Sequence, residues 1–292
     1  MKTPMTNMVL AGSVIASLLL FLACVSSEGG APVPGSITRI VSLSPSLTRQ
    51  VVDLEGGDLI VGVTSFDGFR REGSAVVGTL LQPNIERIIA LEPDLVLFSG
   101  EDGPVQKLEM LKRAGVASRR FGRNRGFRDI CGNYLSLGAL LGKERLARAR
   151  VTGYRERLQG MVHRNRERSK CPLTAFFLSC RPLIAASAES FIGGVIDDSG
   201  GVPAYAGAGM PYPLVSIESL VARDPDVIIC MTGEDDLREF TRMLSDFPGM
   251  KAVAGGRIHL IDPDNVPYYT PADYVTSVER VSALLAAAAG ER

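Results

Sequence analysis

The sequence predicts an α/β fold in which two parallel-sheet lobes are joined by a long helix. In both halves of the 292-residue chain, short apolar runs alternate with segments of helical periodicity, which is typical of parallel strands covered by helices. A fifteen-residue motif occurs once in each half, which indicates that the halves fold alike. A charged, proline-free segment with apolar residues at helical spacing separates the two copies and predicts the joining helix.

The repeated motif occupies residues 84–98 and 216–230, which are 132 positions apart. Each copy starts with a residue that can cap a helix, and Glu86 or Glu218 follows in the first turn, where the helix dipole favours a negative charge. A proline stops the helix, and the apolar run after it predicts a buried parallel strand. The motif therefore predicts the same helix-to-strand unit in both lobes.

The segments around the motif extend the same alternation. Strands are predicted at residues 39–43, 59–63, 95–98, 116–121, 173–178, 227–230 and 257–261. Further helices are predicted at residues 44–54, 105–114, 191–198 and 235–245. Open α/β sheets bind ligands outside the carboxyl ends of their strands, so we expect a ligand cleft between the lobes, next to those ends.

Residues 143–170 form the predicted connecting helix, between an N-terminal lobe at 37–142 and a C-terminal lobe at 171–292. A helix of that length would reach about 42 Å at a rise of 1.5 Å per residue. Gly153 and Gly160 leave a break in the helix open. An ordinary charged surface helix is the alternative to a rigid connector.

The N-terminus predicts export. Lys2 is the only charged residue before Glu28, and the apolar run between them is as long as a signal-peptide core but shorter than the roughly 20 residues that span a membrane. The run ends at Cys24 in a sequence that resembles the lipobox of bacterial lipoproteins. We therefore predict a signal peptide at residues 1–23, a lipidated flexible tether at residues 24–36, and a periplasmic or cell-surface location with a lipid anchor in the membrane. A plain secretory signal or an uncleaved anchor is the alternative.

Composition excludes several classes of function. The 32 Lys and Arg are balanced by 32 Asp and Glu, so the basic surplus that nucleic-acid binding requires is missing, and no nucleic-acid partner is expected. The only two histidines, His163 and His259, cannot build a multi-histidine metal site. No G-x-S-x-G elbow, phosphate-binding loop or H-E-x-x-H motif is present. We therefore expect no enzymatic activity, no cofactor and no resident metal.

The cysteines leave a choice open. An exported compartment permits disulfides, but the sequence does not choose among the pairings of Cys131, Cys171, Cys180 and Cys230. Cys180 and Cys230 each end an apolar run. They can form a disulfide, bind a soft metal or cluster, or stay as buried thiols, so a cysteine-ligated cluster enzyme on a related two-lobe fold is one alternative function.

Four segments in this order resemble the substrate-binding proteins of bacterial ABC importers whose lobes are joined by one long helix: residues 39–48, 61–66, 84–98 and 212–222. The resemblance is to the vitamin B12-binding proteins and their ferric siderophore- and haem-binding relatives. It implies capture of a bulky metal chelate, such as a ferric siderophore, cobalamin or another corrinoid, or haem, and delivery to ABC permease and ATPase subunits. We expect a monomer, and a tethered ligand sensor is the alternative.

The resemblance also assigns roles to single residues. In the family one glutamate per lobe docks onto arginines of the permease, and those positions match Glu86 and Glu218. The family's ligand-contacting positions fall on Phe66, Leu80, Ser99, Tyr212 and Asp264. Two of the four aromatic positions of the vitamin B12 pocket are not aromatic here, and the chain has no tryptophan, which weakens the match to cobalamin.

Other candidate ligand residues come from their type and their place near predicted strand ends. Tyr205, Met210, Tyr268 and Tyr269 lie in two such loops, and tyrosine offers a flat face with a polar tip. Arg123 belongs to an arginine cluster that can grip carboxylate or catecholate groups through forked hydrogen bonds. The alternatives are that the tyrosines pack at the ends of the sheet and that the arginines form a solvated basic face.

Overall fold

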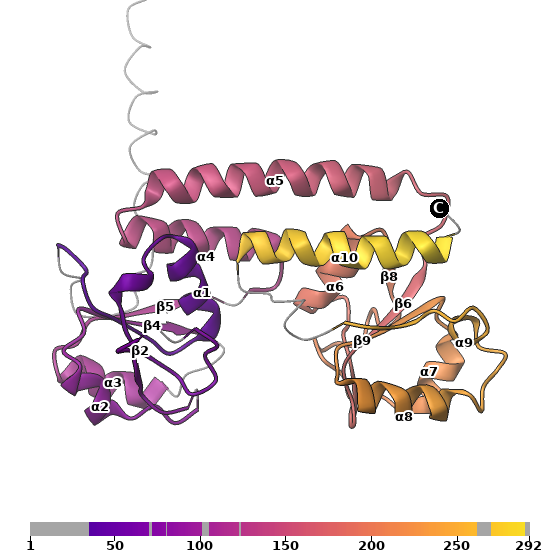
Figure 1. Ribbon diagram of the computed structural model, residues 1–292, viewed down its shortest axis with the longest axis horizontal. Coiled ribbons are helices and arrows are strands. Elements are labelled where there is room, and N and C mark those ends of the chain that lie inside the picture. Colours follow the sequence, from indigo (N-terminus) through magenta and orange to yellow (C-terminus); the bar gives the residue numbers. More distant parts are fainter. Residues whose placement is uncertain are drawn as a thin grey trace, which may run out of the picture.

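The computed structural model describes residues 35–69, 72–79, 81–100, 105–122, 124–261 and 270–289. Within these ranges the chain forms two five-stranded sheets, which lie in separate lobes below a layer of long helices (Figure 1). One helix runs along both lobes. The predicted α/β fold with two sheet lobes and a long joining helix is therefore confirmed.

The first sheet is parallel throughout and has the order β3-β2-β1-β4-β5. Its strands are β1 (Ile40–Ser42), β2 (Ile60–Val63), β3 (Ala75–Val76), β4 (Leu95–Ser99) and β5 (Ser118–Phe121). Its helices are α1 (Pro45–Asp53), the 3-10 helix η1 (Gly57–Leu59), α2 (Ile85–Ala90), α3 (Val105–Arg113) and α4 (Phe127–Leu140). Apolar clusters lie on both faces, which explains why β1, β2 and β4 read as continuous apolar runs.

The second sheet has the order β10-β9-β6-β7, with β8 beside β6. Its strands are β6 (Leu173–Cys180), β7 (Leu183–Ala185), β8 (Val202–Pro203), β9 (Val227–Cys230) and β10 (Ile258–Leu260). Its helices are α6 (Phe191–Asp198), α7 (Ile217–Arg223), α8 (Glu234–Leu244) and α9 (Lys251–Ala254). Strand β7 runs antiparallel to β6, against the expectation of a parallel sheet, because the short turn between them is a hairpin and not a crossover.

The two copies of the repeated motif have the same structure. Asn84 caps α2 by accepting a hydrogen bond from the backbone N–H three residues later at 2.9 Å, and Ser216 caps α7 in the same way at 3.2 Å. After each helix one residue takes a left-handed backbone conformation, Glu92 with φ 46° and Asp224 with φ 45°, directly before a proline. The predicted helix-to-strand unit is therefore present in both lobes.

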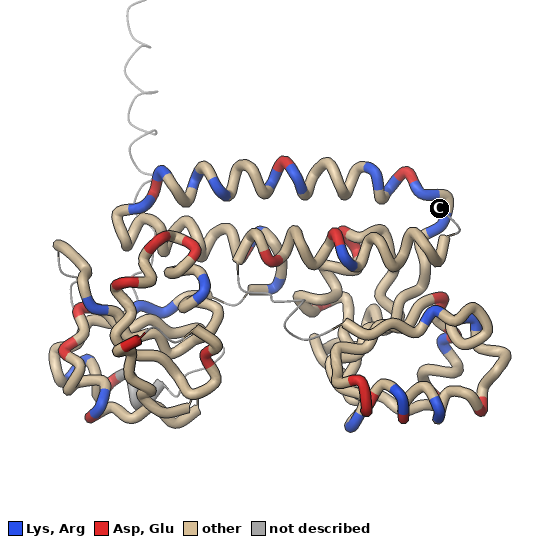
Figure 2. Tube along the Cα trace, viewed as in Figure 1, with Lys and Arg blue, Asp and Glu red and all other residues tan. Residues whose placement is uncertain are grey.

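Helix α5 (Glu144–Arg166) is the connecting helix, and it is continuous through Gly153 and Gly160. Its 23 residues are fewer than the 143–170 predicted, and they reach about 35 Å. Figure 1 shows α5 running along both lobes, and Figure 2 shows charges of both signs along it. Such a mixed polar surface is typical of a helix side that faces water. Helix α5 is thus both a connector and a charged surface helix.

Helix α5 does not join the lobes alone. It packs beside α4 and α10 (Pro271–Ala289), and these three helices form what we call the helical layer (Figure 1). Arg157 of α5 pairs with Glu279 of α10 at 2.7 Å. Helices α4 and α5 supply buried side chains to the cores of both lobes. The layer is therefore shared by the two lobes, whereas α4 and α10 were not predicted from the sequence.

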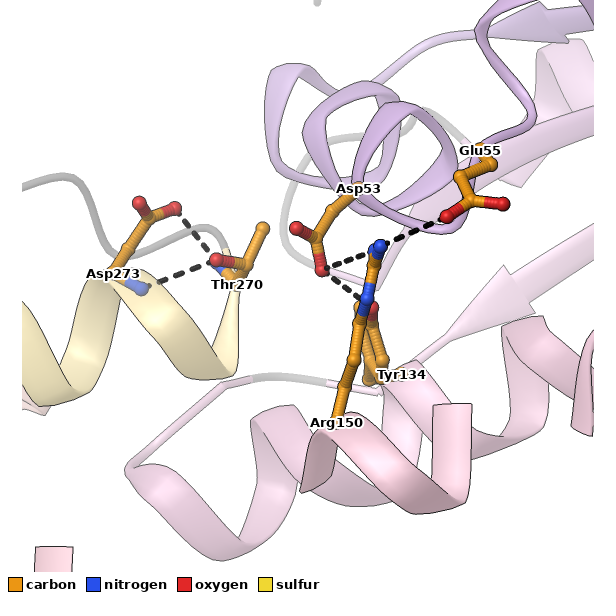
Figure 3. Close-up of polar contacts among 6 residues, drawn as sticks. All are labelled: Asp53, Glu55, Tyr134, Arg150, Thr270 and Asp273. Carbon is orange, nitrogen blue, oxygen red and sulfur yellow. Dashed lines mark hydrogen bonds and ion pairs between the residues drawn. The ribbon is translucent and has the colours of Figure 1, made fainter. Parts of the chain in front are cut away.

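A polar network fastens the helical layer to the first lobe (Figure 3). Asp53, the last residue of α1, accepts a hydrogen bond from the Tyr134 hydroxyl and pairs with Arg150 at 3.6 Å. Arg150 also contacts Glu55 at 3.1 Å. Burial raises the pKa of Tyr134, so the hydroxyl stays protonated and keeps its role as donor.

The first turn of α10 lies beside this network (Figure 3). The Thr270 backbone N–H donates to Asp273 at 3.0 Å, and the Asp273 backbone N–H donates to the Thr270 hydroxyl at 3.1 Å, which is a capping box. Burial raises the pKa of Asp273, the charge of Asp53 adds to that rise, and Arg49 on α1 opposes it. The first turn of α10 therefore lies close enough to α1 for the charges of Asp53 and Arg49 to act on Asp273.

Tyr274 joins three helices near the same place. Its ring centre lies 5.3 Å from that of Phe127 in α4 and 5.2 Å from that of Phe191 in α6. Its hydroxyl donates to Asp198 at 2.7 Å. The side chain is almost completely buried, and this burial raises its pKa. Tyr274 thus packs the helical layer onto the second lobe.

Candidate functional site

Segments that follow the carboxyl ends of strands carry exposed apolar side chains. In the first lobe, Phe66 follows β2 and is 75% exposed, and Leu81 follows β3 and is 73% exposed. In the second lobe, Met210, Tyr212 and Leu214 are exposed in the segment between β8 and α7, where Leu214 reaches 71%. These five exposed apolar side chains, two on the first lobe and three on the second, are the candidate contacts for a bound molecule.

The structure describes about half of the predicted ligand residues. Phe66, Met210 and Tyr212 lie on this exposed surface, whereas Ser99 is buried at the end of β4. The remaining predicted ligand residues lie outside the described ranges: Leu80, Arg123, Asp264, Tyr268 and Tyr269. The predicted signal peptide and Cys24 also lie outside them. Within the described ranges, no helix combines the length and the apolar character that a membrane crossing requires.

Tyr205 has a different place from the one that its sequence suggested. Its side chain is only 2% exposed, and burial raises its pKa. The ring packs edge-on against Phe177, and the guanidinium carbon of Arg223 lies 4.6 Å from the ring centre. The structure therefore places Tyr205 in the core under α7 as a packing residue, because a buried ring offers no surface to a ligand.

Sequence reasoning did not single out Leu81 or Leu214. An exposed leucine and a core leucine look alike in a sequence, and neither residue belongs to a motif with a chemical role. The only available signal was their position, a few residues before the repeated glutamates Glu86 and Glu218.

The two repeated glutamates are both exposed, in the first turns of α2 and α7. The hydroxyl of Ser216 donates a hydrogen bond to Glu218 and lowers the pKa of that carboxyl, which keeps it anionic. Glu86 and Glu218 thus present one negative charge on each lobe, at equivalent places in the repeat.

The described residues contain no group of three or more His, Cys, Asp and Glu side chains that could hold a metal ion. His163 is exposed and lies 3.4 Å from Glu167 one turn away on the same segment. His259 is half-buried in β10, and burial lowers its pKa. The two histidines therefore lie apart, one on the connecting helix and one in the second sheet.

Comparison with known proteins identifies the family. The sequence pattern described as "Periplasmic binding protein" matches residues 40–265, which is most of the chain and includes both sheets. The chain belongs to this family. As a periplasmic binding protein it is an extracytoplasmic substrate-binding protein, and proteins of this kind deliver ligands to the permease and ATPase of an ABC importer.

Among curated periplasmic binding proteins, the vitamin B12-binding protein of Vibrio parahaemolyticus serotype O3:K6 is 28% identical over 195 residues, which cover 66% of this chain and 70% of that protein. The crystal structure of the vitamin B12-binding protein of Vibrio cholerae superposes with a TM-score of 0.73 at 24% identity and covers 86% of this chain and 98% of that chain. The heme-binding protein of Vibrio cholerae superposes with a TM-score of 0.74 at 18% identity, with 85% and 98% covered. At these identities the solved structures show a shared fold and leave the ligand open.

Proposed function

We propose that this periplasmic binding protein captures a bulky metal chelate, namely a ferric siderophore, a corrinoid or haem, between its two lobes. The observation that carries the proposal is the exposed apolar surface on both lobes, with Phe66 and Leu81 on one and Met210, Tyr212 and Leu214 on the other. Sites for small organic ligands are mostly apolar with a few polar groups. The vitamin B12- and heme-binding relatives support this class of ligand.

A thermal-shift panel tests the ligand class. Soluble protein that begins at Ser26 is expected to gain stability with one chelate among cobalamin, haemin and several ferric siderophores, by about 2.7 kcal/mol at 100 times its dissociation constant. The metal-free forms of the siderophores show whether the metal is required. If no chelate shifts the transition of folded, ligand-free protein, the proposed ligand class is wrong.

Two variants locate the binding surface in the same assay. Phe66→Ser is expected to reduce the shift, because it removes the most exposed aromatic side chain of the first lobe. Met243→Ser is the matched control, since Met243 is an exposed apolar residue in α8, outside this surface. An equal reduction of the ligand-induced thermal shift in both variants would contradict the assigned surface.

The proposal includes docking of Glu86 and Glu218 onto basic residues of the permease. The two carboxylates are exposed at equivalent places in the two lobes, and their helices are fixed by capping hydrogen bonds. A pair of equivalent charges suits a partner that presents two equivalent basic sites. Electrostatic complementarity of this kind sets the orientation of a complex.

We also propose that Cys24 is lipidated and anchors the protein to the membrane. The apolar run before Cys24 and the Gly-, Pro- and Ser-rich segment after it support this. Cys24→Ser is expected to move the protein from the membrane fraction to the soluble fraction of cells. Cys171→Ser, which removes an exposed cysteine of the folded part, should stay in the membrane fraction. Membrane retention of the Cys24 variant after residues 1–23 have been cleaved off would contradict lipidation.

A further inference from the structure

Two cysteines end neighbouring strands at the carboxyl edge of the second sheet. Cys180 is the last residue of β6, and Cys230 is the last residue of β9. The two strands are parallel neighbours, with Phe177 opposite Cys230. The ladder between β6 and β7 is irregular at residues 177–179, just before Cys180. Both cysteines therefore come from adjacent strands that end at the same edge.

The two thiols also share one environment. Both belong to the apolar cluster between this sheet and helices α7 and α8, and both are buried. The thiols are hydrogen-bonded to one another, which lowers the pKa of Cys180 and raises that of Cys230, and burial adds to the rise. A thiolate is the form that attacks a disulfide, and two neighbouring thiols allow one to resolve the mixed disulfide that the other forms.

The other two cysteines, Cys131 and Cys171, lie outside this apolar cluster. Cys131 is buried in the core of the first lobe, and Cys171 is exposed ahead of β6. Among the four cysteines of the described residues, only Cys180 and Cys230 have thiols in mutual contact. All four are free thiols, and the shared cluster and neighbouring strands of Cys180 and Cys230 favour this pairing among those that the sequence left open.

We propose that Cys180 and Cys230 form a disulfide in the exported protein. The oxidant is a protein disulfide of the thiol–disulfide exchange class, which an extracytoplasmic compartment supplies. The thiolate of one cysteine attacks it and forms a mixed disulfide, releasing one thiolate of the oxidant. The other cysteine then loses its proton and attacks the sulfur of the first, which releases the second thiolate. The pair loses two electrons and two protons, and the oxidant becomes a dithiol.

The bond would hold both ends of the segment that carries the second-lobe surface. The chain between Cys180 and Cys230 contains Met210, Tyr212, Leu214 and the helix with Glu218. The disulfide itself does not depend on the proposed ligand. Because both thiols are buried, we infer that exchange occurs before the second lobe closes around them.

Alkylation of the exported full-length protein tests the pairing. After acid quenching and denaturation without reductant, iodoacetamide is expected to modify Cys131 and Cys171, while Cys180 and Cys230 appear in one linked peptide pair. Reductant should make all four available. A disulfide-containing protein from the same extract shows that the compartment was oxidising and that the quench preserved disulfides. Modification of both Cys180 and Cys230 without reductant would overturn the proposal.

Two variants sharpen this test. Cys180→Ser is expected to leave Cys230 open to alkylation, whereas Cys131→Ser should leave the linked pair intact. Reduction should lower the thermal midpoint of the wild type and leave that of Cys180→Ser unchanged, because only the wild type has this cross-link to lose. Retention of a linked Cys230 in Cys180→Ser would show a different pairing and would also overturn the proposal. If Cys180→Ser does not fold, the peptide map of the wild type still decides the question.

Discussion

Transport by the double variant Glu86→Ala/Glu218→Ala is expected to fall to background, while its ligand affinity stays at the wild-type value. Both carboxylates are exposed on α2 and α7, and neither belongs to the exposed apolar surface. Loss of one partner from a charged pair that a complex buries costs roughly 2–5 kcal/mol. Two such losses reduce binding to the permease by several orders of magnitude. Uptake of labelled ligand by cells and ligand titration of the purified protein measure the two quantities.

A matched double variant separates docking from a helix-dipole effect. Glu144 and Glu234 are also exposed acidic residues in the first turns of helices, α5 and α8. Glu144→Ala/Glu234→Ala therefore loses similar dipole interactions, each about 0.3–1 kcal/mol of stability, and is expected to transport normally. Wild-type transport by the Glu86/Glu218 variant would refute docking through these residues. Loss of ligand affinity in that variant would place the glutamates at the ligand instead.

Tyr274→Ala is expected to lower the free energy of unfolding by about 3–5 kcal/mol, which is the usual cost of removing a buried aromatic side chain. The ring lies between Phe127 and Phe191, so its loss opens a cavity where α4, α6 and α10 meet. It also leaves Asp198, whose pKa burial already raises, without its hydroxyl partner. Urea unfolding of the purified protein measures the change.

Two tyrosine variants control for this result. Tyr274→Phe keeps the ring and loses one hydrogen bond to a charged group, so it should cost about 1.5–3 kcal/mol, less than the alanine variant. Tyr212→Ala removes an exposed ring and should change stability by less than about 0.5 kcal/mol. The packing role of Tyr274 would be disproved by an alanine variant as stable as the phenylalanine one.

Local signals were enough to predict most of the elements in the two sheets. The motif at 84–98 and 216–230 contains its own cap, its own stop and an apolar strand, so each copy is specified by neighbouring residues. Helix α10 has no comparable signal, because alanine and valine spread its apolar character around the helix. Strand β7 was not predicted either, because a strand of three residues is too short to show the alternation of apolar and polar residues that marks a strand.

The candidate site was less predictable, because exposure depends on the whole fold. Tyr205 and Tyr212 lie in the same glycine- and proline-rich loop, yet the first is buried and the second exposed. What separates them is contact with Phe177 and Arg223, which come from other parts of the chain. The proposed pairing of Cys180 with Cys230 likewise required the order of strands in the sheet, which the sequence does not state.

The position of α10 has a consequence for the order in which the chain can fold during synthesis. Helix α10 supplies several residues to the core of the second lobe: Tyr274, Val275, Val278, Val281 and Leu285. The first sheet is complete once residue 121 has emerged, but this core stays open until residues 271–289 follow. Domains generally fold as units during synthesis, starting from the N-terminus. The core of the second lobe therefore cannot close before α10 has emerged and docked, which is later than the completion of the first sheet.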